Sequence, residues 1–210
     1  INLYFTIGKG IFNGKIIYSE LFDHKGPLIF FIYGIAYLIS STTFLGMYII
    51  EALMWAFMIC AGYFTAKLYI DKIYAFIVAL IYPLFTLPHI LEGGSAEEMI
   101  LVFATISLFF FLSHFKDNSK THKPLIMLIH GIMCAATILI KINLVVFWFF
   151  PLAAIFINLI IGKNYKNLFQ NILAYIAGLL ILFLPIIFYF IYNNALSDAW
   201  NTYIVLNSKY

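Results

Sequence analysis

Hydrophobic residues run through this chain in long stretches separated by short polar joints. A helix needs about 20 mostly apolar residues to cross the hydrocarbon layer, because no water there can satisfy its backbone amides. The stretches predict helices over 28–46, 47–66, 73–91, 97–113, 125–141, 144–161 and 168–192. The alternation with a period of two that marks barrel strands is absent. The predicted fold class is therefore all-α, a polytopic transmembrane helix bundle.

Composition supports this prediction. The 210 residues are 64% hydrophobic and only 10% charged, which excludes a water-soluble fold. All 12 basic residues are lysines, they are scattered, and the formal net charge is only +3. A nucleic-acid partner is not expected, because no basic patch forms that could neutralise phosphates. The lipid bilayer is the expected partner.

The lysine-rich joints at 67–72, 114–123 and 162–167 predict the orientation, since short cytoplasmic loops are enriched in lysine. If these joints lie on the cytoplasmic side of a plasma membrane, residues 1–27 form an external loop, 47–192 the transmembrane helices and 193–210 an external segment. The run 28–46 then lies along the outer leaflet, and the alternative is that it spans. The whole is expected to be one membrane domain, a fragment of a longer chain, because it opens with Ile1 and carries no signal-peptide pattern.

Polar chemistry is densest at residues 14–27, directly before an apolar run. Asp23, His24 and Lys25 supply a hydrogen-bond acceptor, a titratable group and a fixed cation. The structural alternative is an interfacial loop in which the lysine snorkels and the aspartate caps the next helix.

A second polar cluster precedes the run 97–113. Ser95 and Glu98 have the spacing of a capping box, which leaves Glu97 or Glu98 free to bind a hydroxyl or a metal ion. Lys141 interrupts apolar sequence at a predicted outer turn and should face a wet cavity, an anion or the interface. Two histidines on apolar stretches, His89 and His130, are predicted to be hydrogen-bonded core residues.

Residues 14–27 resemble the first external loop of the GT-C class of integral-membrane glycosyltransferases, where a G-x-x-x-Y-x-(D/E)-x-x-x-x-K-(P/G)-P run precedes a hydrophobic helix. The matching residues are Gly14, Tyr18, Glu20, Lys25, Gly26 and Pro27. The pattern is similar to that of bacterial relatives of protein O-mannosyltransferases and lipid A aminoarabinose transferases. Weaker matches are Glu97-Glu98-Met99, Leu139-Ile140-Lys141 and Asn207-Ser208-Lys209-Tyr210.

This resemblance implies that a sugar passes from a polyprenyl-phosphate donor to a lipid, glycan or protein acceptor of the cell envelope, at an active site facing outside. In such a reaction a carboxylate accepts the proton of the attacking hydroxyl and a cation stabilises the departing phosphate. The implied phosphate ligands are Lys25 and Lys141. The candidate catalytic acids are Asp23, Glu97 and Glu98, and the candidate substrate contacts are His24 and Tyr18. A divalent cation is the one cofactor considered, and its ligands are not identified.

The sequence departs from the family pattern in two places. The family's principal acid, an Asp-Glu pair, falls before Ile1, so the general base is expected outside this sequence. Glu51 stands where relatives often carry arginine.

The alternative function is a transporter, flippase or glycan polymerase, in which the same charges guide a lipid-linked or anionic substrate through the bundle. A purely structural subunit predicts no convergence of these residues.

Overall fold

The structure is a computed structural model that describes residues 2–86, 93–117 and 119–209. Within these ranges the chain folds into helices joined by loops, with one isolated bridge between Ile17 and Leu21. The α-helices are α1 (Asn2–Phe12), α2 (Pro27–Ile39), α3 (Leu45–Lys67), α4 (Lys72–Thr86), α5 (Ala96–Lys116), α6 (Pro124–Ile140), α7 (Val146–Ile161), α8 (Tyr165–Tyr192) and α9 (Leu196–Ala199). Short irregular helical turns follow α6, over Ile142–Val145, and α9, over Trp200–Val205 and Asn207–Lys209.

Within the described residues, four segments are long and apolar enough to cross a membrane: Leu45–Lys67, Ala96–Lys116, Ile142–Ile161 and Tyr165–Tyr192. Their outer surfaces are apolar as well, with Phe149 67% exposed and Ile161 75% exposed. A surface of this kind is stable against lipid and not against water. The chain is therefore an all-α helical membrane protein, as the sequence predicts.

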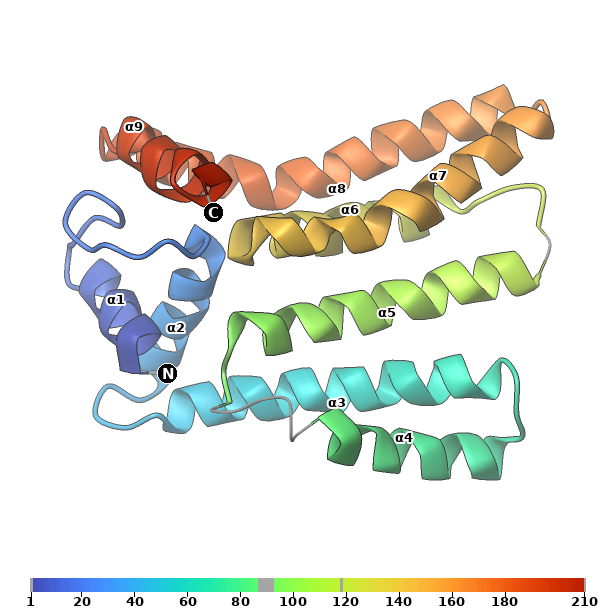
Figure 1. Cartoon of the computed structure of the whole chain (residues 1–210), viewed down its shortest axis with the longest axis horizontal. Helices are drawn as coiled ribbons and strands as arrows, with labels where there is room; N and C mark the ends of the chain where they lie inside the picture. The colour runs from blue at the N-terminus through green and yellow to red at the C-terminus, as the bar shows by residue number, and fades with distance from the viewer. Residues whose placement is uncertain (1, 87–92, 118, 210) are drawn as a thin grey trace.

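The long helices lie side by side, whereas α1 and α2 run across one end of them (Figure 1). At 13 residues, α2 is roughly 20 Å long and too short for a hydrocarbon layer of about 30 Å. Its length and direction agree with the interpretation in which the run 28–46 lies along a membrane surface.

One prediction was wrong at the amino terminus, where residues 1–27 were expected to form a loop. Residues 2–12 instead form α1, which packs on α2 where Gly8 meets Gly34. A Cβ atom on Gly8 would lie 2.5 Å from the Gly34 nitrogen, so the two backbones approach as closely as glycine allows. This contact between separate segments stabilises a helix that the local pattern of polar and aromatic residues does not predict.

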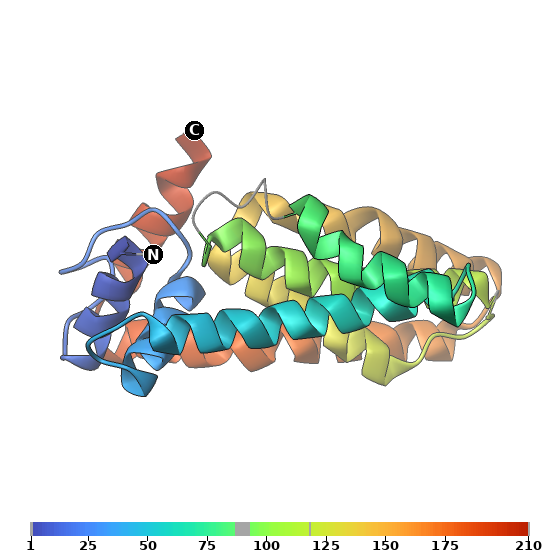
Figure 2. The ribbon, with the colours of Figure 1, turned by 90° about the horizontal axis from the view of Figure 1, so that it is seen from below.

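Helix α6 packs extensively on α8 and also contacts α5. Helix α3 packs between α4 and α5. The chain thus runs up and down, and α1, α2 and the carboxyl-terminal segment gather at one end (Figures 1 and 2). We call this the site end. The joints 68–71, 119–123 and 162–164 lie at the opposite end (Figure 1).

Candidate functional site

The loop between α1 and α2 holds Lys25 through its own backbone. Tyr18 adopts a positive φ of 68° and its N–H donates to the Leu21 carbonyl at 2.7 Å, which closes a tight turn. The Tyr18 hydroxyl donates to the Lys25 carbonyl at 2.6 Å. Asp23 Oδ1 accepts the Lys25 N–H at 2.8 Å. These bonds fix the Lys25 backbone and leave its half-buried side chain without a bonded partner among the residues described.

Gly26 joins this loop to the end of α6. Its N–H donates to the Ile140 carbonyl at 2.9 Å. A Cβ atom at Gly26 would lie 2.1 Å from the Leu139 carbonyl oxygen, so only glycine permits this approach. Helix α6 ends at Ile140, and Lys141 then takes an extended conformation with φ −156° and ψ 99°. Lys25 and Lys141, far apart in sequence, are therefore held beside each other.

Lys141 forms an ion pair with Glu97 in the first turn of α5. The side chains are 27% exposed for Lys141 and 53% exposed for Glu97, so water screens their attraction. The positive charge of Lys25 also lies near enough to attract the Glu97 carboxylate. Three charged groups predicted from separate segments thus meet at the site end.

The carboxyl-terminal segment contacts both the loop before α2 and the end of α6. The Asn207 amide donates to the His24 carbonyl at 2.7 Å and to the Tyr203 carbonyl at 2.8 Å. The Tyr203 hydroxyl donates to the carbonyl of Ile138 in α6. The sequence marks Asn207 only as part of a weak ending motif and does not predict the bonds to His24 and Ile138, because these bonds depend on how the segment after α8 folds back onto the loop and α6.

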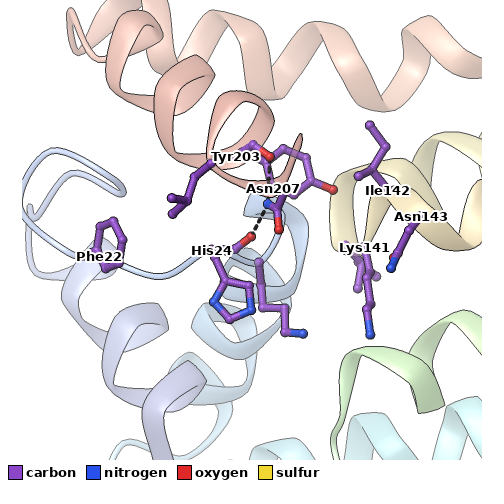
Figure 3. A pocket seen from close by; sticks show the side chains of 10 residues that line it. Phe22, His24, Lys141, Ile142, Asn143, Tyr203 and Asn207 are labelled. Atoms are coloured by element: carbon purple, nitrogen blue, oxygen red, sulfur yellow. Dashed lines mark hydrogen bonds between the residues drawn. The ribbon is translucent and has the colours of Figure 1, made fainter. Parts of the chain in front are cut away.

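A cavity of about 630 Å³ opens between these elements (Figure 3). Its polar lining comes from His24, Lys25, Lys141, Asn143, Tyr203 and Asn207, and its apolar lining from Phe22, Ile140, Ile142 and Leu206. Two cations and the amide of Asn143 beside an apolar wall can bind an anion that carries a hydrocarbon chain.

Two predicted site residues, Tyr18 and Asp23, support the loop and do not line this cavity. Tyr18 stacks on Phe190 of α8 at 5.6 Å between ring centroids, and burial raises the pKa of Tyr18 well above its usual range. Asp23 is 6% exposed. Asp23 and Glu97 both lie near Tyr4 of α1. Burial, and then the negative charges of these two acids, raise the pKa of Tyr4 to about 12.

Glu98 points away from the cations, although it directly follows Glu97. The Ser95 hydroxyl accepts the Glu98 N–H at 3.1 Å, which is half of the predicted capping box. The Glu98 carboxylate does not complete the box: it accepts the indole N–H of Trp55 in α3 at 2.5 Å. Glu51 of α3 accepts the Gly94 N–H at 2.8 Å. Glu51 and Glu98 therefore join α3 to the start of α5.

The histidines lie elsewhere. His130 is fully buried and stacks on Phe111 at 3.9 Å, as expected of a core residue, but its ring nitrogens have no hydrogen-bond partner among the residues described. His122, at the opposite end, shares a 2.8 Å hydrogen bond with Asn171, and burial lowers the pKa of His122. His89 and Glu92 lie outside the described ranges.

Metal ligands are not clustered in the described part of the chain: no group of three or more His, Cys, Asp or Glu side chains there could hold a metal ion. Glu97 pairs with Lys141, and Glu98 bonds to Trp55 of a different helix, so the two acids do not converge on one point. The described acids therefore do not fit the divalent cation considered from the resemblance, and we derive no step through one.

Fold and site together define a polytopic α-helical membrane protein with a two-lysine cavity at one end of its bundle. Residues 1–210 match the family described as "Putative competence-induced protein Ccs4 N-terminal domain". The chain belongs to this family. Searches among curated proteins and solved structures found no match.

Proposed function

We propose that this protein is a membrane glycosyltransferase that moves a sugar from a polyprenyl-phosphate donor to a cell-envelope acceptor. One observation carries the proposal: Lys25 and Lys141 line the same cavity, and an apolar wall lies beside them. A lipid phosphate needs both features, a paired positive charge for its head and a hydrocarbon surface for its chain.

The residues take distinct roles in this proposal. Lys25 and Lys141 stabilise the phosphate as it departs with the lipid, because positive charge placed in advance lowers the energy of a developing anion. His24, whose side chain lines the cavity, contacts the substrate. Asp23 and Tyr18 hold the Lys25 backbone in place. In this proposal the Asp-Glu pair of the family pattern accepts the proton of the attacking hydroxyl.

The proposed active site faces the outside of the plasma membrane. Lysines gather in the joints at the opposite end of the bundle, near 67–72, 116–123 and 163–166. Such enrichment favours the cytoplasm for that end and the external face for the cavity.

Substitution of Lys25 tests the function. Lys25→Met in the full-length protein should lower sugar transfer from a polyprenyl-phosphate donor roughly 100-fold, the order seen when one preorganised charge donor is removed. Transfer is measured in membranes with a radiolabelled donor. Lys15→Met is the matched control, because Lys15 pairs with Glu20 on the same loop at 2.7 Å and lies outside the cavity lining. Undiminished transfer by the Lys25 variant would refute the proposal.

Transport of a lipid-linked or anionic substrate is the second candidate. Buried polar atoms without hydrogen-bond partners in the described ranges favour it, namely Glu98 Oε2, Ser107 Oγ, His122 Nε2, both ring nitrogens of His130 and Trp148 Nε1. Unpaired polar groups inside a bundle are costly and can mark a substrate path. Protein in liposomes that moves a labelled lipid phosphate across the bilayer, without transferring sugar, would favour this candidate over the transferase.

A further inference from the structure

The two lysines of the cavity differ in how their charges are satisfied. Lys141 is paired with Glu97, whereas no carboxylate in the described ranges lies within 4.0 Å of the Lys25 ammonium. The site therefore holds one available cation and one that is already neutralised. A phosphate that binds both lysines must compete with Glu97 for Lys141.

The Glu97 carboxylate can be displaced from Lys141 by a ligand. Its side chain is 53% exposed and lies outside the cavity lining. Among the residues that the structure describes, its side chain bonds to Lys141 alone, unlike Glu98, which is 6% exposed and bonded to Trp55. Glu97 also sits in the first turn of α5, where the helix dipole favours a negative charge even without a lysine partner. Displacing it therefore costs little.

We propose that Glu97 is an internal competitor that occupies Lys141 until the phosphate of a lipid-linked ligand takes its place. The ligand class is a phosphate ester on an isoprenoid chain. This inference rests on the proposed function only for the identity of that ligand. The competition itself follows from the shared position of Glu97, Lys141 and Lys25.

Binding measurements test the competition without any reaction. The probe is geranyl phosphate, titrated into the full-length protein in nanodiscs, with geraniol and inorganic phosphate as parallel ligands. Glu97→Gln should bind geranyl phosphate about two- to fivefold more tightly than the unaltered protein, the range expected when an exposed ion pair no longer competes. High salt should shrink this gain, because exposed charges are screened.

Three further variants test whether the gain comes from the Glu97–Lys141 pair. Glu20→Gln is the control: it removes another exposed acid, 37% exposed against 53% for Glu97, that is paired with a lysine away from the cavity, and it should leave affinity unchanged. Lys141→Met should weaken binding, and adding Glu97→Gln to Lys141→Met should bring no gain, because the competing pair no longer exists.

The outcomes separate this inference from the proposed function. Unchanged or weaker binding by Glu97→Gln overturns the competition, as does the same gain in the Lys141→Met background. A Glu97→Gln gain without any sugar transfer in the full-length protein leaves the competition intact and counts against the transferase. Equal gains for geraniol and geranyl phosphate would overturn a role for phosphate, and a gain for inorganic phosphate alone would overturn the isoprenoid ligand.

Discussion

The neighbouring acids Glu97 and Glu98, at the start of α5, contact different partners. Consecutive residues on a helix point about 100° apart, so Glu97 and Glu98 cannot face the same partner. Glu97 turns to Lys141, and Glu98 turns to Trp55 between α3 and α5. The sequence identifies the pair and the cap at Ser95. It does not say which carboxylate meets a cation, because that depends on where α3 and α6 lie.

Glu98→Ala should lower the thermal stability of the protein, because it leaves the Trp55 indole N–H without its acceptor. We expect a loss of about 1.5–3 kcal/mol, the usual contribution of a hydrogen bond to a charged group. Thermal unfolding in detergent, followed by tryptophan fluorescence, measures the shift. Glu97→Ala is the matched control and should change the midpoint by much less, since its ion pair is exposed. Equal midpoints for the two variants would contradict this assignment.

At the scale of elements, apolar runs predict the helices well. The predicted ranges 47–66, 97–113 and 168–192 correspond to α3, α5 and α8. Such runs are reliable because lipid requires every backbone amide to be paired within its own helix. The pairing of helices is less predictable. Helices α6 and α8 pack most closely where Gly131 faces Gly178, a contact that neither segment shows by itself.

Gly131→Ala should destabilise the bundle. The added Cβ would lie 2.3 Å from the carbonyl oxygen of Tyr175, so the two helices would have to separate. A loss of about 1–3 kcal/mol is typical of such overpacking. Gly62→Ala in α3 is the control, because its Cβ would meet nothing nearer than Tyr82 at 3.9 Å. Thermal midpoints in detergent compare the two, and tolerance of both substitutions would argue against a close α6–α8 contact.

At the scale of the whole molecule, the up-and-down order of the helices decides which residues can meet. An even number of crossings returns the chain to the same end, so the loop before α2, the start of α5 and the end of α6 share the site end (Figure 1). The joint that contains Lys120 falls at the other end. The lysines of the joints predict which end of the bundle faces the cytoplasm.

Cysteine labelling in intact cells tests that orientation. In a protein with Cys60 and Cys134 replaced by alanine, Ser19→Cys should react with a membrane-impermeant maleimide, because Ser19 is exposed at the site end. Lys120→Cys, exposed at the opposite end, should react only after permeabilisation. The reverse pattern would place the cavity in the cytoplasm and exclude transfer to an external acceptor.

The sequence by itself determined the helical class, the membrane setting and the set of charged residues that gather at one end. These follow from local physics: long apolar runs must be helical in lipid, and a charge next to hydrocarbon needs a polar neighbour. The tertiary structure decided the rest. Helix α1 forms because it packs against α2, Glu97 and Glu98 contact different helices, and Asn207 bonds to the loop that contains Lys25. Each of these depends on contacts between segments distant in sequence, which no local pattern encodes.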